Sequence, residues 1–254
     1  MPSAVVQQGQ GARRPLVIAY HLAAEYLRGM HPTAAIWQFW GTPFAKQYSR
    51  AGDGVVRPLA ELVERARREG FEPDPIVLMG WSEGCQAVRA HIWEGSDARK
   101  LIGGAVCLDG IHASTGFPEA QLEPWQWAHD QALADRLAFT WTTSEIATHG
   151  YESTRAVAQK VLGPIVNGIH DEGFFRLIAT PGKGAAEHIK HATMAKSEGA
   201  RAIELASKRS SGGGLLGAIV GGVVGAVCGG AVRGTEGAAV GAVAGAAVGA
   251  IVGG

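Results

Sequence analysis

The chain has 254 residues, enough for one sizeable core and a small appendage. Its 23 basic and 23 acidic residues cancel, so the composition carries no electrostatic footprint for nucleic acid, and we expect no nucleic-acid partner. The three cysteines, Cys85, Cys107 and Cys228, have no CxxC spacing, which argues against a disulfide framework or a structural zinc site and predicts buried free thiols. Residues 1–15 lack the pattern of a secretory signal and are expected to be a flexible N-terminal segment.

Two compositions divide the rest of the chain. Residues 16–207 have an ordinary globular composition and contain all seven tryptophans and all nine histidines. Residues 212–254 consist almost wholly of Gly, Ala, Val, Ile and Leu, and the polar stretch before them is typical of a hinge. We therefore expect a globular domain over residues 16–207, followed by a hinge and glycine-rich tail over residues 208–254.

Within the globular part, apolar runs alternate with helical patterns, as is typical of a parallel sheet covered by helices. Strands are expected at residues 15–20, 75–80, 101–108, 137–142 and 174–180, and helices at residues 55–70 and 85–93. Residues 116–130, with Trp125 and Trp127, are interpreted as an excursion between strands and a candidate lid. The expected fold class is α/β, with flanking helices on a parallel sheet.

Residues 80–84, GWSEG, match the pattern G-x-S-x-G and lie between an apolar strand and a helix. A serine at such a turn is held in a strained conformation, and small flanking residues let the strand and helix approach. The helix N-terminus favours developing negative charge, which makes the Glu83 N–H a candidate oxyanion donor. This context predicts that Ser82 is a nucleophile.

A serine nucleophile of this kind needs an acid and then a histidine later in the chain. Asp109 follows the strand at residues 101–108, at an edge where ligands meet open α/β sheets, and Glu145 after the next strand is the rival acid. His188 follows the last predicted strand and is the candidate base, while His191 lies one turn further on. Both alternatives remain open from these positions alone.

Four further residues are expected to contact the oxyanion or the substrate. His21 and Leu22 follow the first predicted strand, near the place where a second oxyanion donor arises. Glu83 and Trp81 flank the serine. No cofactor is expected, and a metal site is disfavoured because no HExxH pattern is present.

Residues 80–89 (GWSEGCQAVR), followed by residues 106–114 (VCLDGIHAS), resemble the α/β-hydrolase superfamily. More narrowly, they are similar to a loosely characterised group of bacterial hydrolase-like proteins, in which the strand after the elbow helix ends in DGLHAS. The resemblance covers about residues 16–205 and implies that Ser82 is the nucleophile, Asp109 the acid and His188 the base of an ester, thioester or amide hydrolase. Two strands usual before residues 15–20 are missing from the predicted elements, which implies a minimal sheet.

The tail has a glycine at every fourth position, in two runs: Gly213, Gly217, Gly221, Gly225 and Gly229, then Gly237, Gly241, Gly245, Gly249 and Gly253. On a helix such a stripe lets two backbones pack closely, as GxxxG contacts do in lipid. Residues 215–232 and 237–252 therefore predict a transmembrane hairpin, and a disordered or self-associating tail is the alternative. Lys208 and Arg209 favour a cytoplasmic-facing globular domain.

The sequence as a whole predicts a membrane-tethered serine hydrolase that acts on a small-molecule or lipid-like acyl substrate. Membrane association is expected through residues 212–254, and the glycine zipper is also a candidate contact for homo-oligomers. The alternative is a membrane-inserting or self-assembling structural protein whose hydrolase-like domain does not catalyse. Reaction of Ser82 with a fluorophosphonate probe separates the two.

Overall fold

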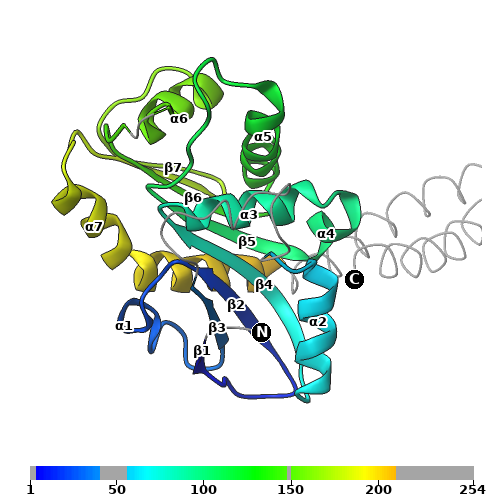
Figure 1. The fold of residues 1–254 in the computed structure, drawn as a ribbon. Helices are drawn as coiled ribbons and strands as arrows, with labels where there is room; N and C mark the ends of the chain where they lie inside the picture. Colours follow the sequence, from blue (N-terminus) through cyan, green and yellow to red (C-terminus); the bar gives the residue numbers. More distant parts are fainter. Residues whose placement is uncertain (1–3, 41–55, 148–149, 210–254) are drawn as a thin grey trace, which may run out of the picture. The chain divides into compact units, whose positions relative to one another are not determined.

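The computed structural model describes residues 4–40, 56–147 and 150–209 (Figure 1). The chain divides into two units, Met1–Ala206 and Ser207–Gly254, and the sheet and its helices belong to the first. The predicted glycine-zipper hairpin lies outside the described residues. Within the described ranges, no helix combines the length and the apolar character needed to cross a bilayer.

One sheet of eight strands forms the centre of the described part, in the order β1-β3-β2-β4-β5-β6-β8-β7. The six inner strands run parallel, and β1 and β7 pair antiparallel at the two edges. The strands are β1 Ala4–Gln7, β2 Arg13–Tyr20, β3 Ala35–Phe39, β4 Glu72–Trp81, β5 Ile102–Leu108, β6 Ala138–Thr143, β7 Gly168–Glu172 and β8 Phe175–Ala179.

Helices cover both faces of the sheet (Figure 1). They are α1 Ala24–Leu27, α2 Leu59–Arg68, α3 Gly84–Trp93, α4 Ser96–Leu101, α5 Glu119–Leu133, α6 Thr154–Leu162 and α7 Ala185–Thr193, and residues 195–209 are also helical. One apolar cluster joins α2, α3, α5 and α6 to one face, and a second joins α1, α7 and residues 195–206 to the other. The domain is therefore a three-layer α/β structure.

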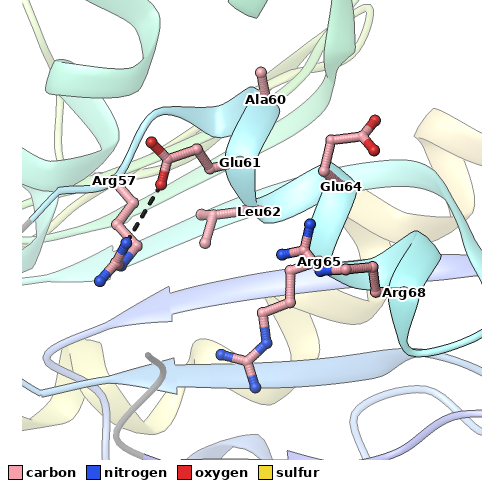
Figure 2. Close-up of a pocket in the computed structure, with 7 residues that line it drawn as sticks. All are labelled: Arg57, Ala60, Glu61, Leu62, Glu64, Arg65 and Arg68. Atoms are coloured by element: carbon pink, nitrogen blue, oxygen red, sulfur yellow. Dashed lines mark hydrogen bonds and ion pairs between the residues drawn. The ribbon is translucent and has the colours of Figure 1, made fainter.

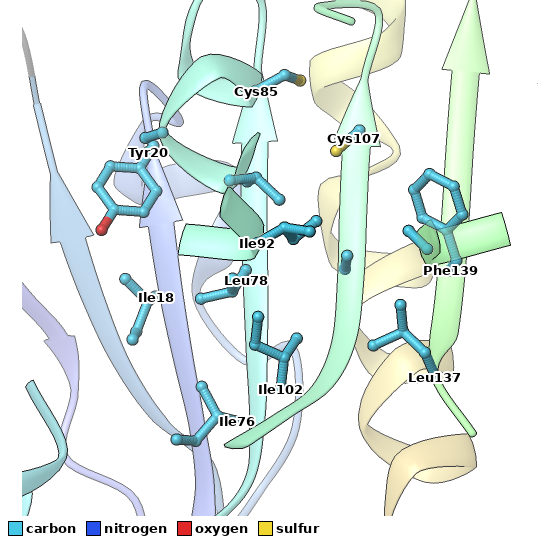
Figure 3. Close-up of a cluster of buried hydrophobic side chains, with 14 of the residues drawn as sticks. Ile18, Tyr20, Ile76, Leu78, Cys85, Ile92, Ile102, Cys107, Leu137 and Phe139 are labelled. Carbon is cyan, nitrogen blue, oxygen red and sulfur yellow. The ribbon is translucent and has the colours of Figure 1, made fainter. Parts of the chain in front are cut away.

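The inner strands are buried on both faces, which explains why their sequences are continuous apolar runs. Alternate residues of one strand serve the two clusters: Ile18 of β2 belongs to the first and Val17 to the second. Figure 3 shows part of the first cluster, where Ile92 of α3 packs beside Leu78 and Ile102. Cys85 and Cys107 are buried free thiols, as predicted.

The five predicted strands and both predicted helices are present, with ends shifted by a few residues. The sheet is not minimal, because it has eight strands. Three of them, β1, β3 and β7, were not predicted. Residues 4–7 were expected to be flexible, but they pair antiparallel with β3 as strand β1. That edge is held by backbone hydrogen bonds and needs no strongly apolar sequence.

The interpretation of residues 116–130 as a lid is wrong. Helix α5 occupies most of this range, and Trp125 is fully buried against the sheet. Its ring centroid lies 6.4 Å from that of Phe139 and 6.3 Å from that of Trp141. Pro124 falls inside the helix and weakens the helical pattern of the sequence.

Candidate active site

Ser82 lies at the turn between β4 and α3 with φ of 54°, in the left-handed region that non-glycine residues rarely adopt. The flanking glycines are a steric requirement. A Cβ on Gly80 would lie 2.6 Å from the Cys85 nitrogen, and one on Gly84 would overlap the Tyr20 carbonyl oxygen. Helix α3 therefore packs directly on the ends of β2 and β4. Residues with a Cβ do not fit at positions 80 and 84 of the turn.

Asp109 follows β5 and also has a left-handed backbone, with φ of 45°. The end of β5 contacts the elbow, because the Ser82 N–H donates to the Leu108 carbonyl at 3.1 Å. Gly110 packs against the Ser82 carbonyl so closely that any Cβ there would overlap it. The nucleophile candidate and the acid candidate thus sit on adjacent strand ends.

Asp109 is 1% exposed and surrounded by donors. Its carboxylate accepts from the Ser144 N–H at 2.9 Å, from Ser144 Oγ at 2.8 Å and from Thr154 Oγ1 at 2.6 Å. Burial alone would raise the pKa of this carboxyl. The hydrogen bonds from His188 and from the two hydroxyls outweigh burial and lower the pKa of Asp109 to about 2.

His188 lies in the first turns of α7, and its Nδ1 is 2.7 Å from Asp109 Oδ2. Trp81 holds the same residue from another side: its Nε1 donates to the His188 carbonyl at 3.0 Å, and the two ring centroids are 4.8 Å apart. The imidazole remains 20% exposed. With Nδ1 engaged by the carboxylate, Nε2 is the nitrogen left to exchange a proton.

The two rival residues have other partners. Glu145 forms an ion pair with Lys183 at 3.2 Å, and its N–H donates to a loop carbonyl. His191 is fully buried, with Nδ1 2.7 Å from Thr142 Oγ1 and Nε2 3.1 Å from Thr180 Oγ1. Burial is the main cause that lowers the pKa of His191. The structure pairs Asp109 with His188 and brings neither rival into that pair.

The residues expected at the oxyanion differ in whether their backbone N–H is already hydrogen-bonded. The His21 N–H donates to the Phe39 carbonyl at 3.0 Å, so it is already used between β2 and β3. The N–H groups of Leu22 and Glu83 donate to no other group in the described part of the chain. The Leu22 side chain is completely buried and apolar, so only its backbone N–H can contact an oxyanion.

Side chains of the same segment form a second acid–imidazole contact. His21 Nδ1 lies 3.4 Å from Glu83 Oε1, and the His21 ring stacks on Trp40 with centroids 5.0 Å apart. Burial, and then the nearby His188, lower the pKa of His21. Burial raises the pKa of Glu83. Both shifts favour the uncharged form of each group.

Sequence reasoning missed the hydroxyl residues around Asp109. Ser144 ends the hydroxyl run that begins at Thr142, directly after β6, and Thr142 Oγ1 accepts from the Asp109 N–H at 2.9 Å. Thr154 starts α6, whose N-cap Ser153 accepts from the Ala156 N–H. Consecutive hydroxyls at the end of an apolar strand were the available signal, because such groups at a sheet edge can serve a neighbouring strand end.

A surface hollow lies elsewhere, along the outer side of α2 (Figure 2). Charged side chains line it, including Arg65, Arg68 and the pair Arg57–Glu61, whose charged atoms are 3.3 Å apart. None of the candidate catalytic residues contributes to it. Exposed pairs of this kind contribute little to stability and indicate a solvated helix face.

No protein-family model matches the chain, and no curated protein matches it in sequence. Among solved structures, an uncharacterised protein from Capnocytophaga ochracea is similar at 15% identity and a TM-score of 0.47, over 72% of this chain and 55% of that one. The chain therefore spans little more than half the length of that protein. Carboxyl esterase 2 from the mycorrhizal fungus Tuber melanosporum is similar at 11% identity and a TM-score of 0.41, over 78% of this chain and 80% of that one. The α/β class of this chain follows from its own eight-stranded, mostly parallel sheet and flanking helices.

Proposed function

We propose that the protein is a serine hydrolase that cleaves an ester, thioester or amide through Ser82, Asp109 and His188. The observation that supports this most strongly is the 2.7 Å contact between His188 Nδ1 and Asp109 Oδ2, one strand end away from Ser82. A partly exposed elbow serine, an imidazole and a buried carboxylate are the three groups that acyl transfer requires.

In the proposed mechanism, Ser82 Oγ attacks the carbonyl carbon and its proton passes to His188 Nε2. The negative oxygen of the tetrahedral intermediate accepts from the Glu83 and Leu22 N–H groups, and α3 begins at this point. Collapse of the intermediate expels the leaving group, which takes the proton from His188. Water then attacks the acyl-serine by the same route and releases the acid.

In this mechanism Asp109 orients the His188 imidazole, and its surroundings keep the carboxylate ionised. A carboxylate with a pKa of about 2 stays ionised across the working range of any hydrolase near neutral pH. It therefore orients the imidazole and stabilises the imidazolium without taking the proton itself. The hydroxyls of Ser144 and Thr154 donate hydrogen bonds that hold the carboxylate in position for this contact.

Labelling by a fluorophosphonate probe tests the proposal, followed by a panel of acyl esters of increasing chain length. We expect the wild-type chain to be labelled and active, and Ser82→Ala to lose both while keeping its circular-dichroism spectrum. Ser197→Ala is the matched control, because Ser197 is an exposed serine on the helix at residues 195–209. Labelling that survives in Ser82→Ala and disappears in no single serine variant would refute the proposal.

We also propose that residues 212–254 tether this domain to a membrane, with the domain on the cytoplasmic side. The support is the four-residue glycine spacing and the apolar composition of the tail. Flotation with vesicles should carry the full chain upward and leave a chain ending at Lys208 behind, still active. Leucine at Gly221 and Gly245 should weaken self-association in detergent while keeping flotation. A full chain that stays soluble and monomeric without lipid would contradict the tether.

A further inference from the structure

The side chains of Glu83 and His21 take no part in the proposed mechanism, which uses only the backbone N–H of Glu83. Glu83 Oε1 and His21 Nδ1 are both buried, and neither has a hydrogen bond to any described residue. They face each other at 3.4 Å, too long for a well-formed hydrogen bond. Buried polar atoms in folded proteins are nearly always hydrogen-bonded, so two unsatisfied atoms beside a reactive serine need a reason.

Two indole rings pack against His21, the imidazole of this pair. The His21 ring lies parallel to Trp40, with 8° between the planes, and its centroid is 5.5 Å from that of Trp81. The backbone of His21 is left-handed, with φ of 57°, a conformation that costs a non-glycine residue some strain. Trp40 is 49% exposed and the Glu83 side chain 29%, so a ligand in solvent can reach both.

His21 does not provide the Glu83 carboxylate with a permanent positive charge. His21 is the one group that forms an ion pair with Glu83 among the described residues, and burial favours its neutral form. The carboxylate therefore lacks a permanent counter-charge. A carboxylate without a permanent counter-ion, whose histidine partner packs on a half-exposed indole, is complementary to a cation, because carboxylates and indole rings both attract positive charge.

We propose that Glu83, next to the His21 ring that packs on Trp40 and Trp81, binds a positively charged ammonium group of the substrate. This inference rests on the proposed function of Ser82. Because Glu83 is the next residue to Ser82, and adjacent Cα atoms are about 3.8 Å apart, the cation lies within a few bonds of the scissile carbonyl. The substrate class is an ester or thioester with an ammonium group close to the bond that is cleaved.

A pair of substrates with equal shape and different charge tests the inference. A thiocholine ester and the corresponding S-(3,3-dimethylbutyl) thioester differ only in a quaternary nitrogen and a quaternary carbon, and the acyl chain is taken from the ester panel. We expect kcat/KM to be about tenfold or more higher for the cation. Glu83→Gln should bring the ratio close to one, chiefly by slowing the cationic substrate. Glu61→Gln, the same change on remote α2, should leave the ratio unchanged.

Equal kcat/KM for the two thioesters in the wild type would overturn the inference and leave the hydrolase proposal standing. The inference is equally overturned if folded, probe-reactive Glu83→Gln keeps the preference. Should that variant not fold, the wild type alone decides: choline should protect Ser82 from the probe at lower concentration than 3,3-dimethylbutan-1-ol, and equal protection overturns the inference. If Ser82 is not labelled at all, the hydrolase proposal fails, and calorimetry with the same two alcohols still reports on the cation site.

Discussion

Two acid–imidazole pairs flank the elbow serine, and they differ in how their carboxylates are satisfied. Asp109 is buried and accepts from an imidazole, two hydroxyls and a backbone N–H. Glu83 meets its imidazole at 3.4 Å and leaves a buried oxygen without a hydrogen bond. The difference appears in the pKa values, which fall to about 2 for Asp109 and rise for Glu83.

The protein itself supplies all the hydrogen-bond donors of the Asp109 carboxylate. The Glu83 carboxylate keeps an oxygen that a ligand could pair with. A carboxylate with four donors is fixed in position and charge, which suits a group that orients a base. A carboxylate that burial penalises, and that only a long contact with an imidazole offsets, gains most when a cation arrives, because binding then supplies a charged partner. Changes in the two regions should therefore have effects of different kind as well as size.

Among changes in the two acid–imidazole pairs, the largest effect is expected from Asp109→Asn. The amide keeps the shape of the side chain but presents His188 with the wrong hydrogen-bonding partner, so the imidazole loses its orientation. We expect kcat to fall by about ten-thousand-fold with little change in the fold. Steady-state kinetics on the best ester of the panel measures this. Glu145→Gln, which removes the rival acid, should stay within about twofold of wild type, and a reversed order of severity would exchange the two roles.

Thr154→Val should have an intermediate effect, because it removes one donor from Asp109 and leaves the carboxylate in place. The loss of a buried hydrogen bond to a charged acceptor should lower the free energy of unfolding at pH 7 by about 1–3 kcal/mol. We expect kcat to fall by roughly ten- to a hundred-fold, since the base is less well oriented. Thr154→Ser, which keeps the hydroxyl, should recover most of both losses.

The pH dependence of that change has a definite sign. The pKa of Asp109 is depressed in the folded state, so its contribution to stability is present above the unfolded value and is lost as pH falls towards 2. The difference between wild type and Thr154→Val should therefore be full at pH 7 and shrink below about pH 4. Urea denaturation at several pH values measures it. A difference that is constant with pH would mean that Thr154 acts through packing alone.

Sequence patterns predict five of the six inner strands. They miss both edge strands and also β3, an inner strand that is buried along its length. The strands at β2, β4 and β5 are buried on both faces and appear as continuous apolar runs. Strand β7, in contrast, is exposed along its whole length, so no hydrophobic pattern separates it from a loop. Its strand conformation comes from pairing with β8, a tertiary contact that a local pattern does not contain.

The candidate site divides in the same way. Ser82 and Asp109 are predictable because each is tied to a local feature, a glycine-flanked turn and a strand end. The donors around Asp109 come from residues 35 and 45 positions away in the chain, and only the folded sheet brings them together. The Glu83–His21 contact joins the ends of β2 and β4, which are neighbours in the sheet, and sheet order is not fixed by local sequence.

The smallest effect, and the sharpest test of the comparison, is the stability of Glu83→Gln. Burial raises the pKa of Glu83, so the folded state holds the proton more tightly than the unfolded chain, and stability falls as pH rises from the ordinary carboxyl value through the raised one. Replacing the carboxyl with a neutral amide removes that penalty. We expect the variant to match wild type near pH 3.5 and to be equal or more stable at pH 7, by at most about 0.5 kcal/mol in urea denaturation. This sign is opposite to that of Thr154→Val. A loss above about 1 kcal/mol at pH 7 would show that the folded protein already satisfies the Glu83 carboxylate, and the two pairs would then be alike.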